Sequence, residues 1–267
     1  MSFTAEWLAM REPYDTQSRS RALVDRLASV TAFRSALTIL DLGSGTGSMM
    51  RHLAPHLRPP QHWLLADHDA SLLTLAEPPG LAVTAETRVV DLALDLGELP
   101  WETVDLVTAS ALLDLVSAHW MNELFERCLA ANAGLYAALN YDGRIAWAPA
   151  HADDGWITGC FNRHQTTDKG FGPALGPACA ERAAEQYRHA TWLVETAPSD
   201  WRLTPSDTDF QRALIDDIAG AATAIEGAQQ SRITEWQTWR LEAVADARSH
   251  LTMGHTDLLA LPAELGR

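Results

Sequence analysis

The sequence of 267 residues lacks several features that would indicate particular classes of protein. Lysine is nearly absent, and acidic residues outnumber basic ones, so the net charge is -15 at pH 7. An acidic surface repels phosphate backbones, and we therefore expect no nucleic acid partner. The sequence also shows no N-terminal signal peptide and no long apolar run, so we expect neither secretion nor a membrane span.

Cysteine is scarce, and its spacing fits neither a disulfide framework nor a zinc site. We therefore expect buried structural thiols in the reducing cytoplasm. Two histidines, His151 and His164, lie near aspartates, but this spacing fits no closed zinc site and we expect no metal. The three cysteines are Cys128, Cys160 and Cys179.

What the sequence does contain is a glycine-rich motif near its start. A short apolar run, 37–42, includes Asp41 and leads into glycines at every second position, Gly43, Gly45 and Gly47. This pattern predicts a buried parallel strand, a tight turn and the start of a helix. Glycine permits the backbone angles of such a turn and lets a ligand approach bare backbone. A dinucleotide-binding turn would place its third small residue one position later, at Ser48.

The segment 41–47 instead matches the pattern D/E-x-G-x-G-x-G and resembles the class I S-adenosylmethionine-dependent methyltransferases, over about residues 35–142. The resemblance implies an α/β fold: a doubly wound, mostly parallel seven-stranded sheet with an antiparallel last strand. Helices would cover both faces, and further helical elements would form a lid and an insertion. It also implies transfer of a methyl group from S-adenosyl-L-methionine to a small molecule by in-line displacement.

Acidic residues follow the next predicted strands. Asp67 lies about twenty residues beyond the glycines, where a carboxylate accepts both ribose hydroxyls of an adenosine. The resemblance implies that Asp91 receives the adenine amino group, since a carboxylate can only accept. His68 would lie along the adenine, or it is an exposed loop histidine; Asp91 has the alternative of a turn residue. The full set of expected cofactor contacts is Asp41, Gly43, Ser44, Gly45, Thr46, Gly47, Asp67, His68, Asp91, Leu92, Ser110 and Ala111.

The fourth predicted strand ends in the sequence ASALLDL, at residues 109–115. Methyltransferases that act on amino groups of nucleic acids carry Asn or Asp, two prolines and an aromatic residue at this place. Their absence favours a small-molecule acceptor.

The segment 148–177 is dense in polar and aromatic side chains, which a plain surface loop does not need. We interpret it as a lid and acceptor pocket inserted after the fifth strand. Histidine titrates in the useful range, so His151 and His164 are candidate general bases together with Tyr141. No base is needed if the acceptor is already ionised or is an amine. Arg11 and Tyr14, between two N-terminal helices, would reach the cofactor carboxylate or cover the acceptor, or they belong to a solvated turn. The expected acceptor contacts are Tyr14, Asp114, Asn140, Asn162, Arg163 and Lys169.

The whole chain is predicted to be one methyltransferase domain. Its parts are a helical cover, 1–34, a cofactor-binding core, 35–147, the lid, 148–177, and the remainder of the sheet, 178–267, with a helical insertion at about 206–250. Two N-terminal helices are expected, one ending before Pro13 and one capped by Asp15 or Thr16. Strands are expected at 37–42, 62–67, 87–90, 104–109, 135–141, 191–196 and 255–261.

Two other functions remain open from the residues. One is a nicotinamide-dependent oxidoreductase on a similar fold, against which the early Gly47 argues. The other is a catalytically silent S-adenosylmethionine-binding protein, against which the crowded segment 148–177 argues. The sequence also leaves open the acceptor, the atom that is methylated and the oligomeric state.

Overall fold

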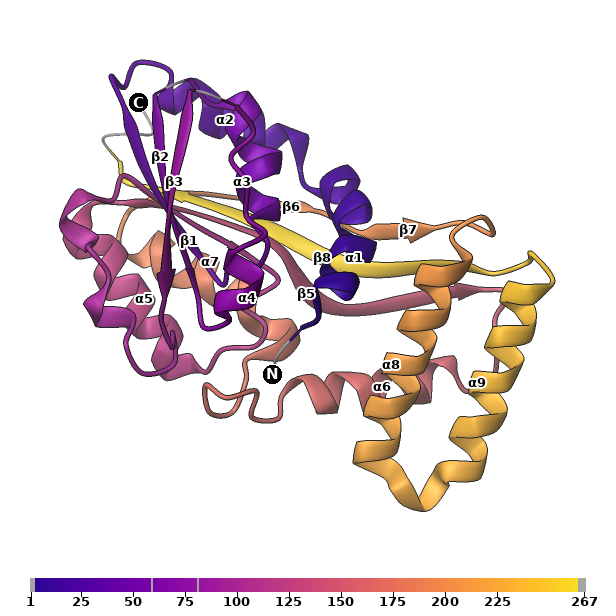
Figure 1. The fold of residues 1–267 in the computed structure, drawn as a ribbon. Helices are drawn as coiled ribbons and strands as arrows, with labels where there is room; N and C mark the ends of the chain where they lie inside the picture. The colour runs from indigo at the N-terminus through magenta and orange to yellow at the C-terminus, as the bar shows by residue number, and fades with distance from the viewer. Residues whose placement is uncertain (1–2, 59, 81, 264–267) are drawn as a thin grey trace.

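A computed structural model describes residues 3–58, 60–80 and 82–263 of the chain. Its centre is a sheet with the strand order β3-β2-β1-β4-β5-β8-β6, in which β7 also pairs with β8 (Figure 1). The strands are β1 (Leu37–Leu42), β2 (Gln61–Asp67), β3 (Val83–Val89), β4 (Leu106–Ser110), β5 (Gly134–Ala148), β6 (Leu193–Pro198), β7 (Trp201–Leu203) and β8 (His250–Leu261).

Strands β1 to β5 pair in parallel, whereas β8 runs antiparallel between β5 and β6. The predicted α/β fold with an antiparallel last strand is therefore confirmed. The predicted number of seven strands is one too small. Residues 201–203, outside the predicted strands, form the additional strand β7, which pairs with the first part of β8.

Helices cover both faces of the sheet, as predicted, because side chains along each central strand alternate between two cores. In β1, Ile39 packs with α2 and α3, whereas its neighbour Leu40 packs in the cluster that includes α5 and α7. The α-helices are α1 (Ala5–Ser18), α2 (Arg21–Thr31), α3 (Ser48–Leu53), α4 (Ala70–Leu73), α5 (Ala118–Ala131), α6 (Asp154–Gln165), α7 (Cys179–His189), α8 (Thr208–Glu226) and α9 (Gln230–Ala245). Short 3-10 turns lie at Ala54–His56, Leu96–Glu98, Trp101–Thr103, Gly176–Ala178 and Gly227–Gln229.

The first helix does not end before Pro13, as the sequence predicted; α1 continues to Ser18 with the proline inside it. Proline removes one backbone hydrogen bond from a helix interior. Side chains beyond it hold the helix in place: Tyr14 stacks on Phe210, with ring centroids 4.4 Å apart, and Asp15 forms an ion pair with Arg11. The next helix is capped by Ser20, so the predicted caps Asp15 and Thr16 are wrong.

Strands β5 and β8 extend beyond the parallel part of the sheet as a long antiparallel pair, which carries α6, α8 and α9 (Figure 1). The fifth strand was predicted to end at Tyr141, but register shifts on either side of Tyr141 let it bend and continue to Ala148. Gly143, with φ +90°, occupies one of these irregular positions rather than a turn. The extension has its own apolar core, which includes Tyr141, Trp147 and Trp236.

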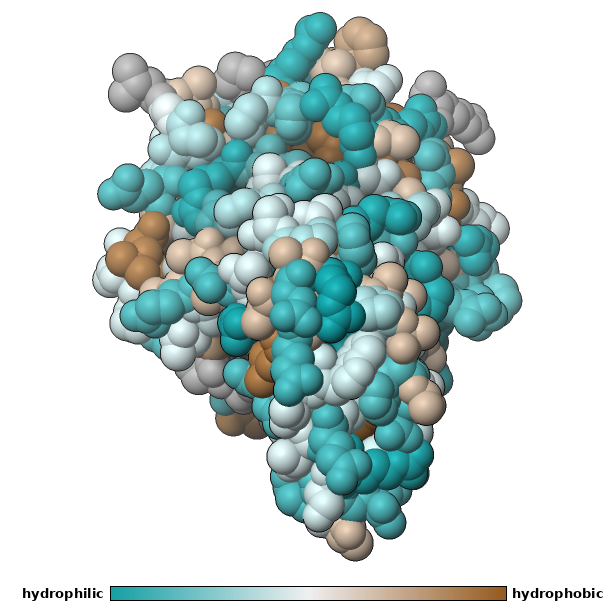
Figure 2. Space-filling view, turned by 90° about the vertical axis from the view of Figure 1, so that its right-hand side faces the viewer, coloured by the Kyte–Doolittle hydropathy of each residue, from teal (hydrophilic) through white to brown (hydrophobic). Residues whose placement is uncertain are grey.

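Arg240 of α9 anchors the far end of this extension. Its side chain is fully buried, forms an ion pair with Asp154, donates to the carbonyl oxygen of Pro149 at 2.8 Å and lies 4.5 Å from the ring of Trp147. Seen from this end, the surface over α8 and α9 is mostly hydrophilic (Figure 2). In the described ranges, no helix is both long enough and apolar enough to span a membrane.

Residues 148–177, interpreted as a lid, form α6 and the segment that follows it. The glycine- and proline-rich part, from Asp168 onward, is irregular as expected, and its turn is held by Asp168, which accepts hydrogen bonds from the backbone N–H groups of Gly170 and Gly172. The three cysteines are free and buried, as predicted.

Candidate active site

The glycine-rich turn lies at the carboxyl end of β1. Gly43, Gly45 and Gly47 have φ values of +64°, +52° and +81°, a region that side chains with a Cβ rarely adopt. The turn is fixed by the N–H of Ser44, which donates to the carbonyl oxygen of Ala66 at 3.1 Å, and by the N–H of Gly47, which donates to that of Ser44 at 2.8 Å. The alternate glycines are therefore required by the backbone, and α3 begins directly after them.

A first cavity of about 280 Å³ lies above this turn and reaches the ends of β2 and β3. Most of the predicted cofactor contacts line it: Asp41, Gly43, Ser44, Gly45, Thr46, Asp67, His68, Asp91, Leu92, Ser110 and Ala111. Gly47 does not line it; this glycine is the N-cap of α3. Side chains of α1 close the cavity from another side, and a Cβ on Gly45 would lie 3.1 Å from the Leu8 side chain.

Asp67 at the end of β2 connects the strand to the turn. Its Oδ2 accepts from the N–H of Gly45 at 2.8 Å, and its Oδ1 accepts from the N–H of Asp69 at 3.0 Å and lies 3.1 Å from Nδ1 of His68. The residue is only 6% exposed but still lines the cavity. A carboxylate has about four acceptor positions, so Asp67 retains capacity for ligand hydroxyls.

Asp91, beyond the end of β3, is exposed and also lines the first cavity. Its Oδ1 accepts from the N–H of Ala93 at 2.9 Å, which fixes the carboxylate in a local turn. The neighbouring Leu92 is buried and provides an apolar wall. Asp91 and Leu92, which were predicted to contact the adenine, therefore give the same cavity one polar and one apolar side chain.

Asp41 inside β1 is 1% exposed, and its Oδ2 has no hydrogen-bond partner within the described part of the chain. Its Oδ1 accepts from the Thr108 hydroxyl at 2.7 Å. Burial raises the pKa of this carboxyl to about 7, against the opposing effects of Thr108 and Arg19. A buried acid that is ready to ionise therefore lies under the glycine turn.

Arg19, between α1 and α2, was not singled out from the sequence. Its guanidinium is buried behind the cavity wall, where Nη2 donates to Ser48 at 3.1 Å and to Ser110 at 3.0 Å, and both serines line the cavity. Its Nε and Nη1 have no partner among the described residues. In the sequence, Arg19 stands directly before Ser20, the N-cap of α2. This pattern fits the start of a surface helix equally well, so the sequence alone does not identify Arg19 as a site residue.

A second cavity of about 590 Å³ lies under the helical extension. The two cavities adjoin, because they share four lining residues: Phe3, Arg11, Ala111 and Leu115. Arg11 is held at this junction by Asp15, to which its Nε donates at 2.9 Å. Trp201 fixes the same carboxylate, since its Nε1 donates to Asp15 at 3.0 Å. The structure therefore brings the N-terminal helix between the two cavities.

Three of the predicted site residues line the second cavity. They are Asp114, an expected acceptor contact, and Tyr141 and His164, two of the candidate bases. Burial raises the pKa of Tyr141 far above its ordinary value, and its hydroxyl donates to Oδ1 of Asn162 at 2.7 Å. Lys169 lines the first cavity, and its Nζ lies 3.2 Å from Nδ1 of His164. Burial and, next, Lys169 lower the pKa of His164, so this imidazole is neutral near pH 7.

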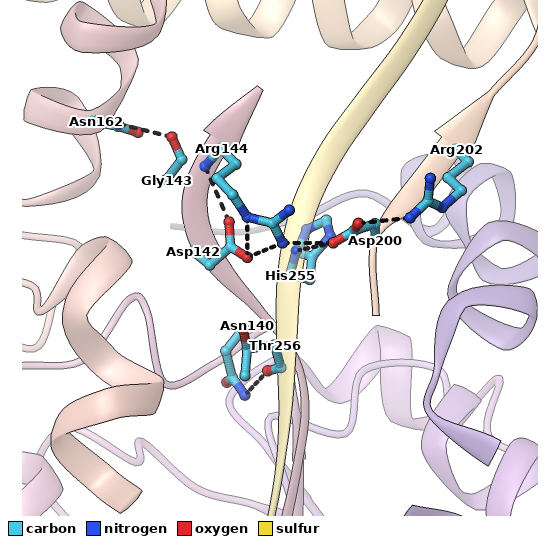
Figure 3. A network of polar contacts seen from close by, with 9 residues as sticks. All are labelled: Asn140, Asp142, Gly143, Arg144, Asn162, Asp200, Arg202, His255 and Thr256. Carbon is cyan, nitrogen blue, oxygen red and sulfur yellow. Dashed lines mark hydrogen bonds and ion pairs between the residues drawn. The ribbon is translucent and has the colours of Figure 1, made fainter. Parts of the chain in front are cut away.

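Several predicted site residues lie elsewhere. Asn140 is inside β5, where its Nδ2 donates to backbone oxygens of Ala137 and Thr256 (Figure 3). Arg163 forms an ion pair with Glu226 on the surface.

Three more of them also hold structural contacts. Tyr14 donates to Asp207 at 3.0 Å. Asn162 donates to the carbonyl oxygen of Gly143 at 3.0 Å (Figure 3). His151 lies against Trp239, with ring centroids 5.0 Å apart. None of the five lines either cavity. Asn140 was predicted to lie at the end of the fifth strand. That strand continues to Ala148, so Asn140 lies in its interior instead.

His255 is a cavity residue that the sequence analysis did not single out. It was expected only as the first residue of the last strand, 255–261, but β8 begins at His250 and carries it in its interior. Its ring is 4.6 Å from that of Trp201. A network of ions borders it, in which Arg144 bridges Asp142 and Asp200 (Figure 3). Burial, and then Arg11, lower the pKa of His255 to about 3, so the ring is neutral at physiological pH.

Neither a protein-family model nor a curated protein sequence matches the chain. Among solved structures, a cyclopropane-fatty-acyl-phospholipid synthase-like protein from Lactobacillus casei ATCC 334 has 17% identity and a TM-score of 0.54, over 98% of this chain and 95% of that one. The cyclopropane synthase MmaA2 from Mycobacterium tuberculosis has 11% identity and a TM-score of 0.47, over 90% and 83%. Phosphoethanolamine N-methyltransferase 2 from Haemonchus contortus, in complex with S-adenosyl-L-methionine, has 14% identity and a TM-score of 0.43, over 97% and 57%. The first similarity agrees with the predicted fold across the full length of the chain.

Proposed function

We propose that this protein is an S-adenosylmethionine-dependent methyltransferase that acts on a small molecule. The observation that carries the proposal is the first cavity: bare backbone at Gly43 and Gly45, with Asp67 at the end of β2 and Asp91 just beyond the end of β3. The similar solved structure from Lactobacillus casei is named a cyclopropane-fatty-acyl-phospholipid synthase-like protein, which is consistent with an enzyme of small-molecule chemistry on this fold.

The residues present fit the cofactor. An adenosyl group needs acceptors for two ribose hydroxyls and for an amino group, which Asp67 and Asp91 would supply. The amino-acid tail needs a carboxylate partner and an ammonium partner. Arg19, acting through Ser48 and Ser110, and the unpaired Oδ2 of Asp41 are suited to these roles. Buried polar atoms without partners are rare in proteins, and a ligand that satisfies them explains why they are tolerated.

S-adenosylmethionine supplies a methyl group on a positively charged sulfur. The chain supplies position: Ala111 and Leu115 line both cavities, so a methyl donor in the first and an acceptor in the second meet beside them. Holding two reactants in contact and in line is a large part of catalysis for such a displacement. The segment 148–177 contributes Phe161 and His164 to the second cavity and Lys169 to the first, consistent with a lid that excludes water.

Among the predicted bases, His164 has the position and the protonation state for the role, because it lines the second cavity and is neutral. Tyr141 keeps its proton at physiological pH and would orient the acceptor instead. His151 contacts Trp239 outside both cavities, which argues against a part in proton transfer. We further propose that the chain works as one domain in the cytoplasm, where its buried free thiols remain reduced.

Calorimetry tests the proposal directly. We expect the purified protein to bind S-adenosylmethionine and S-adenosylhomocysteine with micromolar affinity and to show no heat with NAD(H) or NADP(H). Incubation with methyl-labelled cofactor and a metabolite extract should then transfer the label to a small molecule. Binding of a nicotinamide cofactor alone would contradict the proposal, and cofactor binding without any labelled product would favour a silent binding protein.

A further inference from the structure

The second cavity has an excess of negative charge. Three carboxylates line it, Asp114 after β4 and the pair Asp216 and Asp217 on α8. Of the described residues that line this cavity, Arg11 is the single arginine or lysine, and its charge is matched by the ion pair with Asp15. The carboxylates thus come from two separate elements that face one space.

One of these carboxylates has an oxygen atom without a partner in the described residues. Asp114 is 7% exposed, and its Oδ1 has no hydrogen-bond partner in the part of the chain that the structure describes. Leaving a buried acceptor unpaired is unfavourable. Asp114 lies between Ala111 and Leu115, the residues at the junction of the two cavities, so a donor on a bound acceptor would reach it next to the methyl donor.

The other titratable groups on this cavity do not offset the charge. Burial lowers the pKa of both His164 and His255, so both rings are neutral near pH 7. A further cation, Lys169, lines the first cavity, and burial lowers its pKa while Asp114 raises it. If Lys169 is assigned to Asp114 and Arg11 to Asp15, the two carboxylates of α8 still have no cation.

The remaining walls are aromatic and apolar. Cations bind to the faces of such rings, best to tryptophan. Arg11 already lies in this way 4.9 Å from the ring of Trp201. The aromatic lining residues are Phe3, Trp7, Tyr141, Phe161 and Trp201, and the apolar ones include Leu214, Ile218 and Met253.

From the three carboxylates and the aromatic walls we infer that the methyl acceptor is an amine with an apolar substituent, bound in the second cavity and methylated on nitrogen. This inference rests on the proposed methyltransferase function. The carboxylates of α8 attract the ammonium form into the cavity, and Asp114 accepts a hydrogen bond from its N–H at the junction.

The reaction balances with the groups present. A bound ammonium first loses one proton, to neutral His164 or to water, which leaves a nitrogen lone pair. That lone pair forms the new N–C bond while the electrons of the C–S bond remain on sulfur, so the positive charge passes from sulfur to nitrogen. Fixed carboxylates around the nitrogen stabilise the charge that develops there. The same carboxylates would raise the pKa of a phenol or enol and hinder its ionisation.

Binding of three matched probes tests the acceptor class without requiring turnover. The protein saturated with S-adenosylhomocysteine is titrated with phenethylamine, phenethyl alcohol and hydrocinnamate, which share a phenyl group and differ in charge. We expect the amine to bind at least about tenfold more tightly than the alcohol, a difference of about 1.4 kcal/mol, and the carboxylate to bind most weakly. Equal or reversed affinities would overturn the inference.

Substitutions in α8 test whether the carboxylates of this helix cause the preference for the amine. The double substitution Asp216→Asn and Asp217→Asn should reduce the preference for the amine over the alcohol at least about threefold. The matched control Asp209→Asn, on the same helix but outside both cavities, should leave it unchanged. Both positions of the pair are exposed, so the fold should persist in a thermal melt. An unchanged preference in the double variant would also overturn the inference.

The two proposals fail in different ways. If the protein does not bind S-adenosylhomocysteine, the methyltransferase function is wrong. If it binds but shows no preference for the amine, only the acceptor class is wrong. In labelled extracts, the methyl group should enter compounds retained on a cation exchanger; label confined to phenol ethers or esters would exclude an amine acceptor.

Discussion

At the scale of single residues, Asp67 joins the strand to the glycine turn and faces the first cavity. We predict that Asp67→Ala weakens binding of S-adenosylmethionine at least about tenfold, because a carboxylate that accepts hydrogen bonds from ligand hydroxyls contributes about 1.5–3 kcal/mol. Isothermal titration calorimetry measures the dissociation constant, and circular dichroism checks the fold.

The matched control is Asp246→Ala, whose carboxylate is exposed and paired with Arg248 outside the site. This variant should bind the cofactor like the unmodified protein. An unchanged dissociation constant in Asp67→Ala would show that the ribose assignment is wrong.

The raised pKa of the buried Asp41 carboxyl should make the stability of the fold depend on pH. Burial raises its pKa in the folded state from 3.8 to about 7, so between these values the folded protein keeps a proton that the unfolded chain releases. The contribution of this group to stability is therefore present below about pH 4 and declines as the pH rises toward 7. The slope approaches about 1.4 kcal/mol per pH unit.

Asp41→Asn removes this titration while it keeps an acceptor for Thr108. We expect the free energy of unfolding of the unmodified protein, relative to that of the variant, to fall between pH 4 and 7 and to level off above the pKa of about 7. Urea denaturation of the ligand-free protein at several pH values measures the difference. A difference that does not vary with pH would contradict the assignment of the shift to this residue.

At the scale of elements, the helical extension depends on polar contacts made inside an apolar core. Arg240 is fully buried and holds α9 to Asp154, at the start of α6, and to the carbonyl oxygen of Pro149. We predict that Arg240→Ala lowers the free energy of unfolding by about 3–5 kcal/mol, because it leaves the Asp154 carboxylate without its cation. Chemical denaturation measures the loss, and hydrogen exchange should show it concentrated in α6 and α9.

The control for this prediction is Arg248→Ala, which removes an exposed ion pair with Asp246. Such pairs contribute about 0–1 kcal/mol. Similar losses in the two variants would mean that the buried contacts of Arg240 do not hold the extension together.

The elements also show why the strand ends were predicted unequally well. Asp67 follows a short buried strand, and such strands end where apolar residues stop. Tyr141 also stands at the end of an apolar run, but there the chain shifts register and β5 continues along β8. No local signal marks this continuation, because it depends on a partner more than one hundred residues away.

At the scale of the whole molecule, the charge of -15 governs which partners can approach. The surface seen from the α8 and α9 end is mostly hydrophilic, with apolar residues scattered over it (Figure 2). We predict that the protein gives no mobility shift with duplex DNA at about 10 μM protein and physiological salt, where nonspecific DNA-binding proteins begin to bind.

A basic DNA-binding protein assayed beside it should shift the duplex under the same conditions. A retarded band that disappears with added salt would reveal a basic surface and would reopen nucleic acid as a substrate.

The sequence by itself determined the class of fold and the part of the site that depends on local backbone. Three alternate glycines after a buried strand permit the left-handed backbone angles of a tight turn, and carboxylates at the ends of parallel strands are brought to one edge of the sheet. These are short-range consequences of residue type, so they can be read without coordinates.

Only the tertiary structure decided what forms the second cavity. Trp7, Asp216 and His255 come from three distant parts of the chain and belong to no motif, yet they line the same cavity as Asp114, which the sequence had assigned to the acceptor. They meet because β5 and β8 continue past the sheet and carry α8 over the N-terminal helix. Contacts of this kind arise from packing between remote segments, whose register no local pattern in the sequence records.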